Sequence, residues 1–115
     1  MTKDTFRRDN AYQSRLQSDE CDSLFQAILQ LNDVNECYQF FEDLCTIPEL
    51  KSIAQRWEVA KQLDRGITYQ EISQQLNAST ATISRVNRCL TYGAGGYQQI
   101  LDKLDAQENA GGKAE

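Results

Sequence analysis

Two helix-start motifs, each pairing a threonine with a glutamate three residues later, constrain the fold of this chain most strongly. They are Thr46 with Glu49 and Thr68 with Glu71. In such a capping box, the threonine hydroxyl and the glutamate carboxylate accept hydrogen bonds from backbone N–H groups that the first helical turn leaves free. Apolar residues spaced three and four apart follow the first box over residues 50–63, as on one face of a helix. The motifs therefore predict a long helix after the first box and a shorter one after the second.

The rest of the chain also has helical spacing, and no segment alternates apolar and polar residues as a half-buried strand does. We expect an all-α fold of about six helices, with Ser18 as the N-cap of the first. Their expected ranges are 19–31, 37–45, 46–65, 68–76, 79–90 and 97–104. One helical domain over residues 19–104 would then lie between a flexible N-terminal arm of residues 1–18 and a disordered tail of residues 105–115.

The composition excludes several classes of site. The chain of 115 residues has no histidine, and its four cysteines form no CxxC pair. A zinc site of cysteine and histidine and a histidine-dependent triad are therefore excluded, and we expect the cysteines to be reduced thiols in the core. Because no glycine-rich phosphate loop or catalytic constellation is present, we expect no enzyme activity, no metal and no tightly bound cofactor.

Charge and hydropathy bear on location and partners. No apolar run approaches the length of a membrane span, and the N-terminus lacks the apolar segment of a signal peptide. We therefore expect a cytoplasmic protein without a membrane partner. The formal net charge is −5, yet residues 46–92 carry six basic and four acidic side chains. This segment can supply the local basic surface that a nucleic-acid binder requires, although the charge alone does not establish DNA binding.

Residues 69–88 have the pattern of two short helices that cross at a steep angle. Such a pair requires a small residue where the helices approach each other, here Ser73. It also requires a residue that tolerates positive φ in the turn, here Asn77. Apolar side chains occupy the interior positions, namely Ile72, Leu76, Ile83 and Val86. With its flanking residues, the segment predicts a helix-turn-helix over residues 68–90.

The second helix of this motif carries polar residues that face outward or flank the helix contact. They are Ser79, Thr80, Thr82, Ser84, Arg85 and Arg88. Hydroxyl groups donate to phosphates or base edges, and arginine binds guanine or phosphate with two hydrogen bonds. The pattern favours DNA binding. The alternative is a helical pair for packing or protein contact, as in an accessory transcription factor similar to part of a sigma factor, in which Arg85→Ala leaves function intact.

Segments on both sides of the motif add a family resemblance. They are residues 46–49, Arg56 and residues 63–66, together with residues 71–72 and 81–85 within the motif. On these residues the chain resembles the Trp repressor family, in particular its YerC/YecD-type branch. The resemblance implies an intertwined homodimer that acts as a repressor and binds double-stranded DNA at a pseudo-palindromic operator. The DNA-binding helix pairs of the two protomers would lie roughly 34 Å apart, one turn of DNA. The apolar N-terminal helices also favour a dimer, because a chain this small cannot bury them alone.

The resemblance also implies roles for individual residues. Its base-facing residues would be Gln70, Thr80, Ala81 and Ser84. Arg56 and Arg85 would form a pocket for a small-molecule corepressor, because two arginines can clamp a carboxylate and sandwich an aromatic ring. The rest of the wall would be Thr82, Cys89 and, from the partner chain, Asp43, Cys45 and Thr46.

Two residues depart from the pattern of the tryptophan-responsive repressors. Val86 stands where these proteins have a small glycine, and Cys89 where they have the serine that receives the amino group of the ligand. The first change fills volume and the second weakens a polar contact. These departures disfavour tryptophan as the effector. They leave open a different small molecule or none, with Arg56 and Arg85 then serving as phosphate or ion-pair residues.

Overall fold

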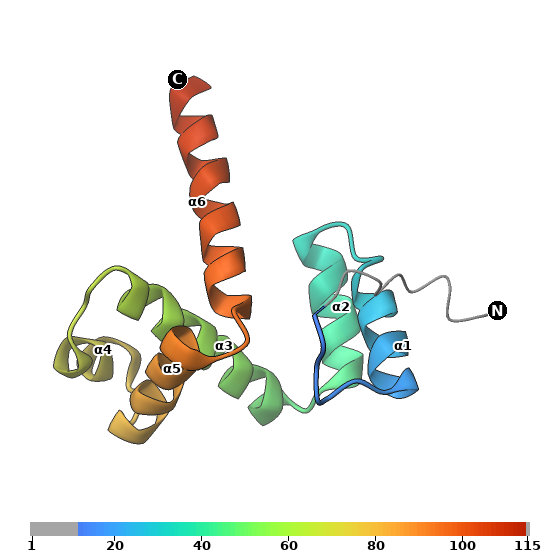
Figure 1. Ribbon diagram of the computed structural model, residues 1–115, viewed down its shortest axis with the longest axis horizontal. Helices are drawn as coiled ribbons and strands as arrows, with labels where there is room; N and C mark the ends of the chain where they lie inside the picture. Colours follow the sequence, from blue (N-terminus) through green and yellow to red (C-terminus); the bar gives the residue numbers. More distant parts are fainter. Residues whose placement is uncertain (1–11, 115) are drawn as a thin grey trace. The chain divides into compact units, whose positions relative to one another are not determined.

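The computed structural model describes residues 12–114 and contains six α-helices (Figure 1). They are α1 (Asp19–Ile28), α2 (Val34–Leu44), α3 (Ile47–Asp64), α4 (Tyr69–Leu76), α5 (Thr80–Tyr92) and α6 (Gly96–Ala114). Residues 12–114 contain no strand, so the all-α prediction is confirmed. None of the described helices is long and apolar enough to span a bilayer.

The chain divides into two compact units, Met1–Leu44 and Cys45–Glu115. The first contains α1 and α2, and the second contains α3 to α6, so the expected domain of residues 19–104 extends over both. Of the expected N-terminal arm, residues 1–11 lie outside the described residues. Residues 12–18 contain a turn but no helix or strand.

The predicted capping residues begin their helices as expected. At the start of α3, the Thr46 hydroxyl accepts from the Glu49 N–H at 3.2 Å, and the Glu49 carboxylate accepts from the Thr46 N–H at 2.8 Å. At the start of α4, Thr68 and Glu71 make the same pair of bonds at 3.2 and 3.4 Å. Ser18 caps α1 by accepting from the Cys21 N–H at 3.0 Å. Local hydrogen bonds therefore determine where these helices begin.

The core of the second unit lies where α3 meets α4 and α5. Its buried residues are Val59, Ala60, Ile72, Ala78, Ile83 and Val86. Ile72, Ile83 and Val86 were predicted as interior residues of the helix-turn-helix, and Leu76 packs against the same cluster while partly buried. The core therefore fixes α4 and α5 against the longer α3, as the sequence pattern predicts.

The turn between α4 and α5 has the predicted backbone conformation. Asn77 ends α4 with a φ of 55°, in the left-handed region that asparagine tolerates better than most residues. The Ser73 hydroxyl donates to the carbonyl oxygen of Ala78 at 2.9 Å. The small residue expected at the helix contact thus also stabilises the turn.

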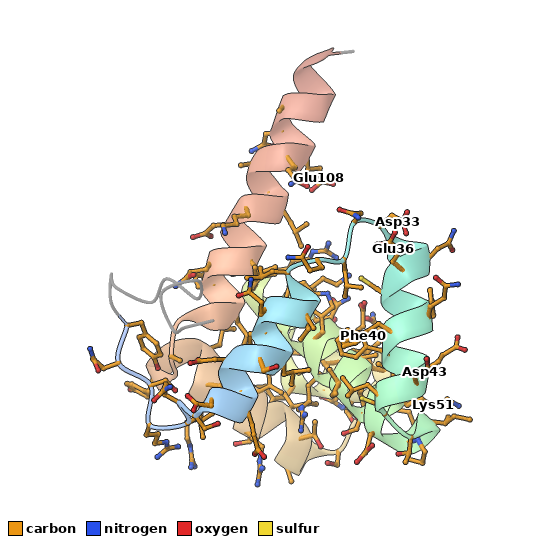
Figure 2. The ribbon with its side chains drawn as sticks, turned by 90° about the vertical axis from the view of Figure 1, so that its right-hand side faces the viewer. Asp33, Glu36, Phe40, Asp43, Lys51 and Glu108 are labelled. Carbon is orange, nitrogen blue, oxygen red and sulfur yellow. The ribbon has the colours of Figure 1, made fainter. Side chains whose placement is uncertain are left out.

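The first unit leaves much of its apolar surface uncovered within one chain. Phe25 of α1 is 56% exposed and Tyr38 of α2 is 59% exposed, and α2 has no buried residue. Phe40 and Phe41 pack edge to face, with ring centroids 5.5 Å apart. Figure 2 shows Phe40 on α2, between Glu36 near one end of the helix and Asp43 near the other. A helix with apolar side chains this exposed has a surface suited to burial against another chain.

Three predicted helix boundaries are wrong. Helix α1 ends at Ile28 and not at residue 31. Helix α2 begins at Val34 and not at residue 37, because Asp33 and Glu36 form a capping arrangement inside the polar segment interpreted as a break. The Asp33 carboxylate accepts from the Glu36 N–H at 2.8 Å, and the Glu36 carboxylate accepts from the Asn32 N–H at 2.9 Å.

The expected disordered tail of residues 105–115 is corrected through residue 114, because α6 continues to Ala114. The segment directly after Leu104 contains alanine, glutamine and glutamate, which have high helix propensity. These side chains are exposed up to Ala110. This part of α6 therefore continues without a buried face, although its helix-favouring residues are mixed with Asp105, Asn109 and two glycines, which have low helix propensity.

The expectation that all four cysteines lie in the core is also wrong within one chain. Cys37 and Cys89 are exposed, and Cys21 and Cys45 are only half-buried. Their positions follow the apolar spacing of their helices, but other helices of the same chain do not fully cover those faces.

We expect Ile72→Ala to lower the free energy of unfolding by about 2–5 kcal/mol, because it leaves a cavity between α4 and α3. Urea unfolding, at equal protomer concentration for all variants, measures the change. Gln74→Ala, at an exposed position of the same helix, is the control and should stay within about 0.5 kcal/mol of the wild type. Equal losses in the two variants would contradict this assignment of the core.

Candidate nucleic-acid interface

The exposed surface of α4 and α5 contains most of the residues predicted to contact DNA. Gln70 is exposed in the first turn of α4. On α5 the exposed predicted residues are Thr80, Ala81, Ser84, Arg85 and Arg88. The buried residues Ile83 and Val86 lie on the opposite face of α5 and hold it against the core. The structure therefore presents the predicted polar face of α5 to the outside of this unit.

The chemistry of this surface suits a polyanion. The first turn of α5 contains no acidic residue, so no carboxylate competes for the free N–H groups at its N-terminus. A helix N-terminus carries a partial positive charge that favours phosphate, and the exposed guanidinium groups of Arg85 and Arg88 add full positive charges. Hydroxyl groups and one methyl group lie between these charges and the start of the helix, at Thr80, Ala81 and Ser84.

Ser79 has a different place from the other predicted contact residues. It is the N-cap of α5, and its hydroxyl oxygen accepts from the Thr82 N–H at 3.1 Å. The same hydroxyl is 3.1 Å from the Thr82 hydroxyl, to which it is hydrogen-bonded. Ser79 therefore shapes the start of α5, and its contact with DNA stays a prediction.

Three of the predicted ligand residues come together in one pocket between α3 and α5. The pocket has a volume of about 250 Å³ and is lined by Ser52, Gln55, Arg56, Ala81, Thr82 and Arg85. Ser52 and Gln55 were not predicted as lining residues. The available signal was their position on α3, four residues and one residue before Arg56, which places all three near one side of the helix. Two guanidinium groups at one small opening can hold a carboxylate or phosphate.

The other predicted ligand residues do not line this pocket within one chain. Cys89 is exposed on α5, and Thr46 has its hydroxyl in the capping box of α3. Cys45 is half-buried just before that box, and Asp43 belongs to the first unit. Figure 2 shows Asp43 near the end of α2 and Lys51 on α3. Asp43, Cys45 and Thr46 were expected to come from a partner chain, so their roles stay predictions.

Residues of α6 contribute to the surroundings of Arg56. Tyr97 stacks on Trp57, with ring centroids 6.3 Å apart and an angle of 23° between the planes. Burial raises the pKa of Tyr97 above its ordinary value, the Arg56 guanidinium partly opposes this effect, and Cys89 adds to it. Tyr97 was predicted only as an apolar residue of the last helix, and its interaction with Arg56 was missed because the two are 41 positions apart in the sequence.

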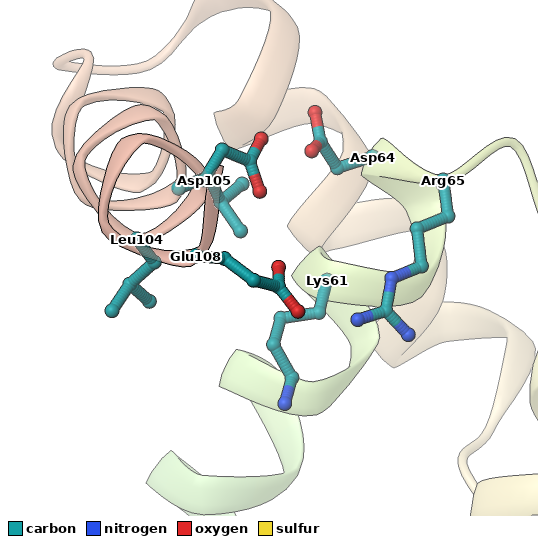
Figure 3. A pocket seen from close by; sticks show the side chains of 7 residues that line it. Lys61, Asp64, Arg65, Leu104, Asp105 and Glu108 are labelled. Carbon is teal, nitrogen blue, oxygen red and sulfur yellow. The ribbon is translucent and has the colours of Figure 1, made fainter. Parts of the chain in front are cut away.

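A second, larger opening lies at the end of α3 beside α6 (Figure 3). It has a volume of about 490 Å³ and is lined by Lys61, Asp64, Arg65, Leu101, Leu104, Asp105 and Glu108. Figure 3 shows the carboxylates of Asp105 and Glu108 directed from α6 toward the side of α3. The opening contains none of the predicted site residues. Among the described residues, no group of three potential metal ligands is present.

Comparison with known proteins identifies the family of this arrangement. Residues 19–105 match the family model described as Trp repressor protein. The chain belongs to the Trp repressor family. The predicted resemblance is therefore confirmed, and the matched residues include both the apolar helices α1 and α2 and the helix-turn-helix.

Individual members of the Trp repressor family are similar over most of their length. A Bacillus subtilis (strain 168) protein described as uncharacterized protein YerC is 53% identical over 94 residues, which cover 82% of this chain and 90% of that protein. The crystal structure of a TrpR-like protein from Eubacterium eligens ATCC 27750 has a TM-score of 0.76 and 52% identity, covering 78% of this chain and 93% of its own. The crystal structure of a Staphylococcus aureus protein described as a putative Trp repressor has a TM-score of 0.76 and 51% identity, covering 78% of this chain and 90% of its own. The predicted fold and the predicted resemblance to the YerC-like branch of the family are thus both confirmed.

We expect Tyr97→Phe to change how stability depends on alkaline pH, because it keeps the ring and removes the titrating hydroxyl. The pKa of Tyr97 is raised in the folded state above its ordinary value near 10, so the unfolded chain loses this proton first as the pH rises. The contribution of the hydroxyl is therefore complete below about pH 10 and is lost as the pH rises through the folded-state pKa. Urea unfolding of both proteins between about pH 8 and pH 11 measures the difference, and a pH-independent difference would contradict the expectation.

Proposed function

We propose that this protein is a sequence-specific DNA-binding transcriptional regulator that acts as a repressor. The observation that carries the proposal is the exposed polar and cationic face of α5, held on a helix-turn-helix in a chain of the Trp repressor family. Occupation of a promoter suffices for repression.

The start of α5 enters the major groove in this proposal. Thr80, Ala81 and Ser84 face base edges there, with Gln70 contributing from the start of α4. Short hydroxyl and methyl side chains suit close approach to bases, including contact with the thymine methyl group. Arg85 and Arg88 contact phosphates, which position the helix without themselves specifying a sequence.

The protein binds its operator as a homodimer in this proposal. Exposed apolar residues of the first unit support it, namely Phe25 on α1, Leu29 directly after that helix and Tyr38 on α2. Burying such side chains contributes about 25 cal/mol for each Å² of apolar surface removed from water. Two copies related by a twofold axis also match the symmetry of a pseudo-palindromic operator.

The pocket beside α5 is a candidate effector site. Arg56 and Arg85 provide the charge for a small anionic group, such as a carboxylate. Its volume of about 250 Å³ lies below the range of roughly 300–1,000 Å³ that is usual for drug-sized ligands. Val86 fills core volume at a position where a glycine would leave space, so we propose an effector smaller than tryptophan.

Selection of bound fragments from a random-sequence DNA library tests the main proposal. The selection is run at near-physiological salt, because low salt inflates non-specific binding, and in parallel with and without tryptophan. We expect a palindromic motif of equal enrichment in both arms. Enrichment only with tryptophan would contradict the proposed effector. No motif in either arm would favour either a protein-contact function or a requirement for a different effector.

We expect Arg85→Ala to weaken operator binding by about tenfold for each protomer of the dimer, because each protomer loses a charge-assisted phosphate contact. Fluorescence anisotropy over a series of salt concentrations measures the affinity and should give a salt slope smaller by about two, one for each protomer. Arg65→Ala, at an exposed arginine that ends α3, is the matched control and should bind as the wild type does. Unchanged affinity and slope in Arg85→Ala would contradict the proposed contact.

We expect Phe25→Asp to prevent dimer formation at micromolar concentration, because it places a charge on an apolar surface that the partner covers. Sedimentation equilibrium measures the molecular mass in solution. Ser23→Asp places the same charge at an exposed polar position of α1 and should leave the dimer intact. A dimeric Phe25→Asp variant with wild-type affinity between its chains would rule out this interface.

A further inference from the structure

The turn between α4 and α5 is the point from which the DNA-facing helix is positioned. Helix α4 ends at Leu76, and Asn77 then turns the backbone through the left-handed region. The last carbonyl groups of a helix have no partner within that helix. Carbonyl groups in a turn therefore require other donors, and those donors determine how firmly the turn is held.

Side chains of the helix-turn-helix itself provide two of the hydrogen bonds that hold the turn. Ser73 donates to the carbonyl oxygen of Ala78 at 2.9 Å, and Ser79 accepts from the Thr82 N–H at 3.1 Å. Both are local, joining residues that are three to five positions apart. They fix the shape of the turn but do not connect it to another helix.

Gln55 provides the connection to α3. Its side-chain amide nitrogen donates to the carbonyl oxygen of Leu76 at 3.3 Å, across 21 positions of sequence. Gln55 and Leu76 are both half-buried, so water competes less for this bond than for an exposed one. Among the side-chain hydrogen bonds of residues 12–114, this one reaches the turn from outside the helix-turn-helix.

The same side chain lies next to the face that is proposed to read DNA. Gln55 lines the pocket together with Ala81 and Thr82, which belong to the first turn of α5. Thr80 and Ala81 lie only three and four positions after Asn77, the residue that makes the turn. A displacement of the turn relative to α3 therefore moves these residues directly.

We propose that Gln55 is a positioning residue for DNA recognition, because it ties the turn of the helix-turn-helix to α3. The inference rests on the proposed DNA-binding function and assigns no contact between Gln55 and DNA. Hydrogen bonds to base edges depend on tenths of an ångström, whereas phosphate contacts by long cationic side chains tolerate small displacements. Loss of the Gln55 bond therefore weakens binding to the operator more than binding to unrelated DNA.

Gln55→Met tests this proposal, because methionine keeps the length and helix propensity of glutamine and removes its amide. We expect operator affinity to fall by about two- to tenfold for each protomer of the dimer, the range that one ordinary hydrogen bond contributes. Affinity for unrelated DNA should change less than twofold. The matched control is Gln62→Met, two turns further along the same side of α3 and outside the pocket lining.

A second measurement separates positioning from a general loss of stability. Hydrogen exchange of the free protein should be faster in Gln55→Met at the amides of Gln75 and Leu76, in the last turn of α4, with little change in the core of α3. An equal fall in operator and non-specific affinity, or unchanged exchange at these amides, would overturn the positioning role. If the wild type itself binds no operator, the proposed function fails as well. If the wild type binds and Gln55→Met binds equally well, only the role of Gln55 is wrong.

Discussion

The burial of apolar side chains between α3 and the helix-turn-helix is the interaction on which the second unit depends. Helix α4 has eight residues and α5 has thirteen, and isolated helices of such lengths are marginal in water. Ile72 and Ile83 are fully buried against the α3 residues Val59 and Ala60. This contact holds the two short helices in place, and it also determines which face of α5 remains exposed to bind DNA.

A different constraint applies to the first unit, which cannot cover its own apolar surface. The apolar faces of α1 and α2 remain substantially exposed in one chain, a state that favours association. In the proposed dimer, one interaction therefore serves both stability and function. It buries these faces and sets the spacing of the two helix-turn-helix motifs. Because DNA binding then requires the dimer, DNA affinity should depend on protomer concentration.

The pocket lies next to the turn of the helix-turn-helix, so a molecule bound in the pocket can affect the position of the turn. Arg56 and Arg85 provide the positive charge of an anion-binding pocket. Val86, which follows Arg85 in the sequence, is buried in the core. Gln55 lines that pocket and bonds the carbonyl group of Leu76. A molecule that enters the pocket would therefore contact Gln55, the side chain proposed to position α5.

Features governed by neighbouring residues were predictable from the sequence. The capping boxes at Thr46 and Thr68, the left-handed Asn77 and the apolar positions of the helix-turn-helix rest on hydrogen bonds or periodicities within a few residues. The start of α2 was predictable in principle from Asp33 and Glu36, but the polar segment around them was interpreted as a break. The continuation of α6 beyond residue 104 was not predicted.

Only the tertiary structure decided which distant residues meet. The bond from Gln55 to Leu76, the stacking of Tyr97 on Trp57 and the joining of Arg56 with Arg85 in one pocket each depend on how α3 packs against later helices. The sequence by itself determined the helices, their caps and the motif, because those interactions are local. Contacts across 20 or more positions require the packed core, where burial selects one arrangement among many that the same helices allow.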